Sequence, residues 1–274
     1  MKINLFDDET WHSLKPLTFT RPVADLRIGI LTIAEKWAKH LNADFGFQTQ
    51  DYLSAKFLAK PNATFFINGS ICPDEGLVAA INDLKIGEVL LKDDILIAHY
   101  EDSNDLELVT FNNEIQYKRD FVRIVYPEDI FKHNGAELVK DFALLTKGRT
   151  SAKLSSTNTL IGDQIFVEEG ANAECATFNS LQGPIYLGKN AQVWEGSNIR
   201  GSFALCHNSQ VKMGAKIYGQ TTIGPYSRVG GEINNAVIWG YSSKGHEGYL
   251  GNSVMGQWCN IGASNNRVTS TPQH

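Results

Sequence analysis

The stretch LGKNAQVWEGSNIRGSFALCHNSQVKMGAKIYGQTTIGPYSRV, residues 187–229, carries an aliphatic residue at every sixth position. These positions are Leu187, Val193, Ile199, Leu205, Val211, Ile217, Ile223 and Val229. Four residues after each of the first seven, the side chain is mostly small: Ala191, Ser197, Phe203 (the exception), Ser209, Ala215, Thr221 and Ser227. A period of six matches neither the 3.6-residue turn of a helix nor the two-residue alternation of a strand.

A fixed period of six predicts a three-sided parallel β-helix, in which each hexapeptide forms one face. The aliphatic residue points into a narrow core, the small residue allows the chain to turn a corner, and successive coils pair as neighbouring strands. A two-sheet β-sandwich is the alternative, but it requires turn signals every 8–12 residues or so. Weaker copies of the repeat lie at Ile161 and Val167 and, in a shifted frame, at Tyr249, Met255 and Ile261. We therefore predict a β-helix over residues 153–267 and an irregular tail over residues 268–274.

Residues 1–152 follow a different pattern, in which strand-like and helix-like segments alternate. The predicted strands are residues 3–6 and 64–68 and a hairpin at residues 88–100 that turns at 92–94. The predicted helices are residues 26–41, 74–84 and 127–148, the last as one long helix or two short ones. The sequence thus predicts an α/β domain followed by an all-β domain.

The composition excludes several classes of protein. A net charge of -5 over 274 residues gives no general electrostatic reason to bind nucleic acid or an anionic membrane. The four cysteines are far apart in the sequence, which indicates reduced thiols rather than disulfides or a zinc site. The first residues lack the apolar region of a signal peptide, and no apolar run is long enough to span a bilayer. We predict a cytoplasmic protein without nucleic-acid or membrane partners.

The segments RVGGEI (228–233) and AVIWGYSSKGHEGYLGNSVMGQWCNIGAS (236–264) carry a resemblance to a known family. They resemble the acetyltransferase half of bifunctional N-acetylglucosamine-1-phosphate uridyltransferases, which contains R-P-G-A-E-L, S-K-x-x-H-x-x-Y-x-G-D and N-I-G-A-G motifs. The hexapeptide frame itself resembles the left-handed β-helix acyltransferases. The resemblance therefore implies a left-handed β-helix and a homotrimer.

The whole chain resembles bacterial sugar nucleotidyltransferase-like proteins of that family, with LFDDETWHSLKPLTFTRPVADLRIGILTIAEKW (5–37) as the N-terminal signature. The family continues for several coils beyond the last motif, so the resemblance implies that this chain is a shortened form. It also implies a sugar phosphate or a nucleotide sugar as the small-molecule partner.

The resemblance assigns catalytic roles to four residues of the β-helix: His246, Tyr249, Asn260 and Ala263. His246 would be the general base that deprotonates a sugar amine for attack on acetyl-CoA, a task that suits the near-neutral pKa of imidazole. Tyr249 and Asn260 would orient the amino sugar, and the Ala263 N–H would face the developing oxyanion. The alternatives are an exposed loop histidine at position 246 and a packing role for Tyr249.

The resemblance also assigns substrate-binding roles to Arg228 and Lys244. Arg228 matches an arginine that holds the sugar phosphate, and Lys244 corresponds to the lysine of the S-K-x-x-H motif. The alternative for Arg228 is an outward-facing residue of a coil. Two features depart from the family pattern. Lysines that precede the histidine segment in the acetyltransferases correspond to Asn234 and Asn235, and the spacing between Arg228 and His246 is shorter by about two hexapeptides.

The N-terminal half lacks the G-G-x-G-T-R loop with which nucleotidyltransferases of this superfamily hold phosphates. Asp7 and Asp8 stand in its place and are candidate Mg²⁺ ligands, with a strand-end turn or a helix cap as the alternative. Arg21 and Arg27 are candidate phosphate ligands. Ser70 occupies the position of the metal-binding aspartate that follows a strand in these enzymes.

These observations leave several functions open. The first is acetyl-CoA-dependent N-acetylation of an amino-sugar 1-phosphate, linked to sugar-nucleotide synthesis. The second is sugar-1-phosphate nucleotidyl transfer by the N-terminal domain, and the third is a non-catalytic, trimeric sugar-nucleotide-binding protein. A β-helix carbonic anhydrase would need three metal-binding histidines per site, whereas the repeats contain only His207 and His246.

Overall fold

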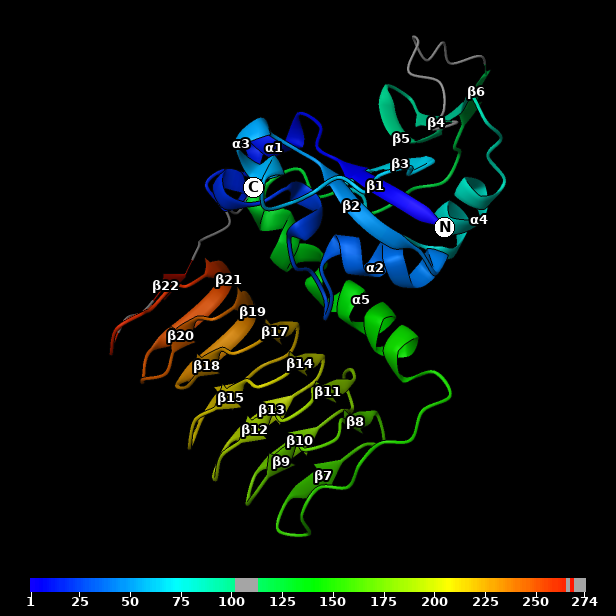
Figure 1. The fold of residues 1–274 in the computed structure, drawn as a ribbon. Helices are drawn as coiled ribbons and strands as arrows, with labels where there is room; N and C mark the ends of the chain where they lie inside the picture. Colours follow the sequence, from blue (N-terminus) through cyan, green and yellow to red (C-terminus); the bar gives the residue numbers. More distant parts are fainter. Residues whose placement is uncertain (102–112, 265–266, 269–274) are drawn as a thin grey trace. The chain divides into compact units, whose positions relative to one another are not determined.

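The computed structural model describes residues 1–101, 113–264 and 267–268 (Figure 1). The chain packs as two compact units. Unit 1 comprises Met1–Leu26 and Leu31–Pro127, and unit 2 comprises Arg27–Ile30 and Glu128–His274. Among the described residues, no helix combines the length and the apolar character needed to cross a membrane.

Unit 1 contains a six-stranded mixed sheet with the strand order β2-β1-β3-β5-β4-β6. Its strands are β1 (Lys2–Phe6), β2 (Asp44–Gln48), β3 (Phe65–Asn68), β4 (Glu88–Lys92), β5 (Ile95–Tyr100) and β6 (Asn113–Gln116). β1 pairs in parallel with both β2 and β3, so the carboxyl ends of these three strands meet at one edge of the sheet. The hairpin predicted at residues 88–100 is confirmed as the antiparallel pair β4–β5.

The helices of unit 1 are α1 (Thr10–Ser13), α2 (Ile33–Leu41), α3 (Asp51–Ser54) and α4 (Glu75–Asn82), with 3-10 turns η1 (Leu17–Thr20) and η2 (Val23–Asp25). The helix predicted from residue 26 begins only at Ile33. Thr32 and Glu35 form a reciprocal capping box there, which satisfies the free N–H groups of the first turn. The prediction was wrong for residues 26–32, because Leu26 and Ile30 are buried in irregular segments and not on a helical face.

The edge strand β2 was not predicted from the sequence. Gly46 lies in its middle, and glycine is unfavourable in strands. A Cβ atom at position 46 would lie 2.2 Å from the backbone nitrogen of Lys60, so this close approach of two backbone segments requires glycine. The Lys60 N–H also donates to the Asn4 side-chain oxygen at 2.7 Å. Tertiary contact therefore decided the conformation here, against the local preference.

Unit 2 contains one long helix and a parallel β-solenoid of about six turns, consistent with a left-handed β-helix. The helix is α5 (Pro127–Thr146), which settles the sequence alternatives in favour of one long helix. The strands are β7 (Thr159–Ile161), β8 (Ile165–Val167), β9 (Asn172–Ala173), β10 (Thr177–Asn179), β11 (Ile185–Leu187), β12 (Gln192–Val193), β13 (Asn198–Arg200), β14 (Phe203–Leu205), β15 (Gln210–Val211), β16 (Lys216–Ile217), β17 (Thr221–Ile223), β18 (Arg228–Val229), β19 (Glu232–Gly240), β20 (Ser243–Lys244), β21 (Tyr249–Gln257) and β22 (Arg267–Val268). Of the tail predicted over residues 268–274, residues 269–274 lie outside the described residues.

The aliphatic residues of the repeat form the core of the β-helix, as predicted. All eight have at most 2% of their surface exposed. They stack in register from coil to coil, as in the row Leu187, Leu205 and Ile223 and the row Val193, Val211 and Val229. Of the weaker copies of the repeat, Val167 is buried and Ile161 is 37% exposed.

The small residues of the repeat are buried as well, and several of them link neighbouring coils. The Ser197 hydroxyl donates to the Lys212 carbonyl at 2.9 Å, and the Ser209 hydroxyl donates to the Gly224 carbonyl at 2.7 Å. A serine thus turns the corner and satisfies a backbone acceptor of the next coil.

The fold predicts a large difference between two leucines of the β-helix. Leu205 is fully buried in the core row, whereas Leu181 is 72% exposed. We expect Leu205→Ala to lower the free energy of unfolding by about 3 kcal/mol, because it removes buried methyl groups and leaves a cavity. The matched control Leu181→Ala should change it by less than about 0.5 kcal/mol. Urea unfolding followed by circular dichroism measures both; equal losses would contradict the assignment of the core.

Candidate site at the carboxyl ends of β1 and β3

A cluster of hydrogen-bonded polar side chains lies where β1 and β3 end. Asp8 follows β1, and its carboxylate accepts hydrogen bonds from the Asn68 side-chain amide at 2.7 Å and from Arg123 Nη2 at 2.7 Å. The other carboxylate oxygen accepts from the backbone N–H and the hydroxyl of Thr10, at 3.0 and 2.5 Å. Burial alone would raise the pKa of Asp8, but the hydrogen bonds from Thr10, Asn68 and Arg123 lower it below its usual range.

Arg123 reaches this cluster because its backbone pairs with the chain that follows β3. Ile71 and Arg123 form an antiparallel bridge, and the Ile124 N–H donates to the Ser70 carbonyl at 2.8 Å. Arg123 Nε lies 3.2 Å from the Ser70 hydroxyl, to which it donates, and that hydroxyl in turn donates to the Asn68 side-chain oxygen at 2.7 Å. The guanidinium is therefore fixed by two backbone contacts and two side-chain acceptors.

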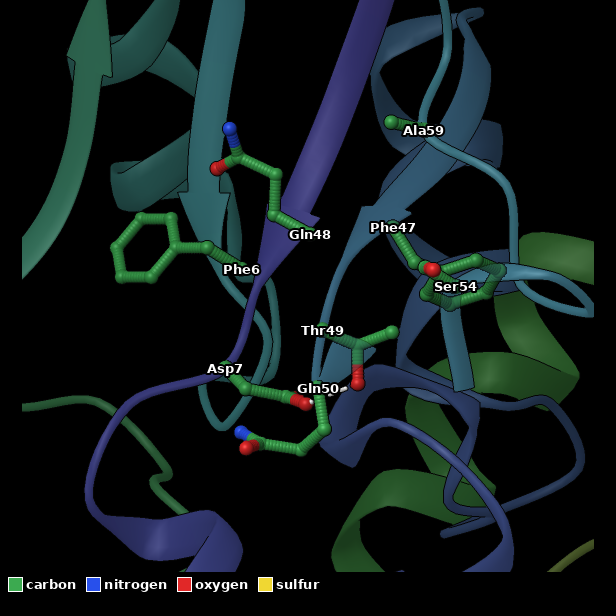
Figure 2. Close-up of a pocket in the computed structure, with 8 residues that line it drawn as sticks. All are labelled: Phe6, Asp7, Phe47, Gln48, Thr49, Gln50, Ser54 and Ala59. Atoms are coloured by element: carbon green, nitrogen blue, oxygen red, sulfur yellow. Dashed lines mark hydrogen bonds between the residues drawn. The ribbon is translucent and has the colours of Figure 1, made fainter. Parts of the chain in front are cut away.

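A pocket of about 420 Å³ lies beside the cluster, where β1 and β2 end (Figure 2). Its lining residues are Phe6, Asp7, Phe47, Gln48, Thr49, Gln50, Ser54 and Ala59. Asp7 accepts hydrogen bonds from the Thr49 hydroxyl at 2.5 Å and from the Val23 N–H at 2.8 Å. Phe6 pairs with Gln48 and Phe47 with Leu5, so the two aromatic rings lie on opposite faces of the sheet. The amide, hydroxyl and carboxylate groups of the pocket suit a polar ligand such as a nucleobase.

Asp7 and Asp8 ionise over different pH ranges although they are adjacent in the sequence. Burial, with a smaller contribution from the neighbouring Asp8 carboxylate, raises the pKa of the Asp7 carboxyl to about 6, against the hydrogen bonds from Thr49 and Val23, which lower it. Among the described residues, no arginine or lysine pairs with Asp7 to offset the burial, in contrast to Asp8. The two carboxyl groups of this edge therefore titrate in different pH ranges.

The candidate metal ligands Asp7 and Asp8 do not assemble into a metal centre. Asp8 is saturated by donors from the protein, one of them a cationic guanidinium. Throughout the described part of the chain, no three or more His, Cys, Asp or Glu residues lie together in a way that fits a metal ion. One or two carboxylates with phosphate oxygens are enough to hold Mg²⁺, so what disfavours the metal here is that protein donors, including a guanidinium, already occupy Asp8.

The two arginines predicted to bind phosphate belong to different units. Arg21 is 5% exposed in unit 1 and pairs with Asp25 at 3.0 Å. Arg27 belongs to unit 2, where its guanidinium donates to the backbone carbonyls of Ile30 and Trp239. Both guanidinium groups thus bind acceptors of the protein itself.

The predicted base His246 lies in the exposed loop after β20. No hydrogen-bond partner of its imidazole is found among the residues that the structure describes. Its backbone carbonyl accepts from Lys244 Nζ at 2.5 Å. Lys244 is 1% exposed, stands in register with Val229 in a core row, and has a pKa lowered by burial. The Lys244 ammonium therefore supports the loop from inside and does not reach the surface, where a phosphate would bind.

The other residues predicted for the acetyl-transfer site lie on the neighbouring coils. Arg228, Ser243 and Asn260 follow one another in a single row of paired residues, and both Arg228 and Asn260 are exposed. Two strand spacings, about 10 Å, separate them. Exposed Ala263 precedes Ser264, whose N–H donates to the Glu247 carbonyl at 3.0 Å. The hydroxyl of Tyr249 lies 3.5 Å from the Asn234 amide. The structure thus places the His246 loop beside the turn that contains Ala263.

Sequence reasoning missed Asn68 and Arg123. Asn68 ends a strand that was predicted, so its position beside Asp8 follows once β1 and β3 are known to be parallel neighbours. Arg123 carries no such signal, because it lies 115 residues from Asp8 in the sequence and belongs to no named helix or strand.

A family model described as sugar nucleotidyl transferase matches residues 3–150, more than half of the chain. The chain therefore belongs to the sugar nucleotidyl transferase family. Comparison with curated proteins finds no significant match. The family supports a sugar-related transferase with a sugar phosphate or nucleotide as substrate. The narrower membership of the bifunctional uridyltransferases, the homotrimer and the cytoplasmic location stay predictions.

The raised pKa of Asp7 predicts a pH-dependent effect of its replacement. Because the folded state binds the Asp7 proton more tightly than the unfolded state, the carboxyl destabilises the fold increasingly as the pH rises from about 4 to 6. We expect Asp7→Asn to gain on the order of 1–2 kcal/mol relative to the wild type between pH 4 and pH 7. Melting temperatures across this range test it. The matched control is exposed Asp94→Asn, and an equal pH dependence in both variants would contradict the prediction.

Proposed function

We propose that unit 1 transfers a nucleotidyl group from a nucleoside triphosphate to a sugar 1-phosphate. The observation that carries the proposal is the position of the Asp8–Arg123 cluster and the Asp7 pocket at one sheet edge. In α/β sheets ligands bind outside the carboxyl ends of parallel strands, and β1, β2 and β3 end at this edge. The family match over residues 3–150 supports the same class of substrate.

The proposed reaction joins two phosphate-bearing substrates. An oxygen of the sugar 1-phosphate attacks the α-phosphorus of the triphosphate, and a new P–O bond forms. The bond from the α-phosphorus to the bridging oxygen breaks, and pyrophosphate leaves with the electron pair. Such transfers depend mainly on positioning and on neutralisation of negative charge.

The residues of unit 1 fit these two tasks. The pocket provides the side-chain amides of Gln48 and Gln50 for hydrogen bonds to a base. Arg123 presents a fixed guanidinium for a phosphate. Mg²⁺ would supply further neutralisation when bound, but protein donors already occupy the Asp8 carboxylate, and no step here depends on the metal.

Filling the pocket should abolish nucleotide use. Ser54 lines the pocket, and a tryptophan there would occupy the space of the base. We expect Ser54→Trp to lower pyrophosphate release from nucleoside triphosphates and sugar 1-phosphates by about a hundredfold. Lys56→Trp, two residues further at an exposed position that does not line the pocket, is the matched control and should keep wild-type activity. No pyrophosphate release by the wild type with any pair in a screen would overturn the proposal.

A second candidate is N-acetylation of an amino-sugar 1-phosphate by unit 2, with acetyl-CoA as donor and His246 as base. The observation in its favour is that the Lys244 ammonium and the Ser264 N–H hold the exposed His246 loop beside Ala263. The proton would pass from the sugar amine to the imidazole while nitrogen attacks the thioester carbonyl, and CoA would leave as the thiolate.

Two histidines of the β-helix test this second candidate. We expect His246→Ala to lower the release of free CoA thiol by a factor of about 100 or more, because a general base contributes at least that much. His207→Ala, at another exposed position of the β-helix, should have no effect. If the two variants behave alike, or no thiol is released, the acetyltransferase is excluded. Binding of a sugar nucleotide without any turnover would then favour the non-catalytic binding protein.

A further inference from the structure

A guanidinium stands at the point of unit 1 where the sequence predicted a metal ion. The resemblance implies a metal-binding aspartate at the position of Ser70, and Asp8 was, with Asp7, a predicted Mg²⁺ ligand. In the structure Arg123 donates to both, with Nε 3.2 Å from the Ser70 hydroxyl and Nη2 2.7 Å from the Asp8 carboxylate. The Ser70 hydroxyl and the Asp8 carboxylate therefore hold the guanidinium of an arginine in place of a metal ion.

We propose that Arg123 replaces the divalent cation of this site, and that unit 1 binds the phosphates of its substrate through Arg123 without a metal. The inference rests on the proposed function for the class of ligand, a polyphosphate. The proposed site differs from a metal-dependent nucleotidyltransferase in one respect: the Arg123 guanidinium, and not a metal ion, neutralises the negative charge of the phosphates.

The remaining donors of Arg123 suit a phosphate. A guanidinium has five N–H donors, and Asp8 and Ser70 engage one each. Among the described residues the other donors of Arg123 have no hydrogen-bond partner. The side chain is 24% exposed, so solvent and ligand reach it. A planar fork of N–H groups fits two phosphate oxygens at once.

Asp8 orients the guanidinium, as a carboxylate orients a bound ligand group, but its negative charge also opposes a phosphate nearby. A variant of Asp8 can therefore distinguish an Asp8 that binds a metal ion from an Asp8 that orients Arg123. If Asp8 were a metal ligand, its loss would weaken phosphate binding. Because it holds Arg123 instead, Asp8→Asn keeps an acceptor for the guanidinium and removes the repulsion. We expect Asp8→Asn to bind polyphosphate as tightly as the wild type or more tightly.

Isothermal titration of the full chain with inorganic pyrophosphate in the presence of EDTA tests the proposal. We expect the wild type to bind, Arg123→Gln to bind roughly 10- to 100-fold more weakly, and Arg123→Lys to lie between them, because lysine keeps the charge and loses the fork. Arg119→Gln, at an exposed position four residues earlier, is the matched control and should leave the affinity unchanged. Circular dichroism confirms that each variant is folded.

A second titration uses Mn²⁺ without pyrophosphate. We expect the wild type to show no Mn²⁺ binding that is lost in the Asp8→Asn variant. The proposal is overturned if the wild type does not bind pyrophosphate in EDTA, if Arg123→Gln binds as well as the wild type, or if Mn²⁺ binds through Asp8. Its failure is distinct from failure of the proposed function. Arg123-dependent binding without pyrophosphate release in the screen would leave this inference standing and remove nucleotidyl transfer, whereas metal-dependent release would do the reverse.

Discussion

The structure of unit 2 depends on the stacking of buried aliphatic side chains along the axis of the β-helix. Strands of two or three residues have no stability of their own. Each one persists because its inward side chains contact the equivalent residues of the coils before and after it, as in the row Val193, Val211 and Val229. The core is narrow, so the residues between the inward ones face outward or turn a corner. The outward positions, such as Arg228 and Asn260, are thereby free to vary without loss of the fold.

The same constraint explains the position of Lys244, an ionisable residue in a core row. Lys244 takes the place that valine holds in the three preceding positions of the row. A buried ammonium is unfavourable unless it finds an acceptor, and the carbonyl of His246 provides one. The chain gives up an aliphatic contact at the coil where the histidine loop leaves the repeat. The loop is consequently anchored from the interior by the Lys244 ammonium, in addition to the hydrogen bond from the Ser264 N–H.

The sequence predicted the β-helix well because its signal is repeated eight times and each repeat has the same physical cause. It predicted less in unit 1, where single contacts decide the structure. The close approach of Gly46 to Lys60 overrode a poor strand sequence, and the Thr32–Glu35 capping box set a helix start that hydrophobic spacing placed too early. Asp7 and Asp8 were found because they end a recognisable strand. Arg123 was not, since no local pattern indicates a partner 115 residues away.

Residues 27–30 have a consequence for any attempt to divide the protein into its parts. The N–H of Gly29 donates to Asn134 of α5 and the Gly29 carbonyl accepts from Thr222, while the Ile30 N–H donates to Asp141. These partners are buried, so a fragment that begins at residue 128 would lose one backbone donor to the Asp141 carboxylate and one to the Asn134 side-chain oxygen. Unit 2 is therefore encoded by two separate stretches of the sequence. Autonomous folding of the C-terminal half would need the tetrapeptide RIGI supplied in trans, as in fragment complementation.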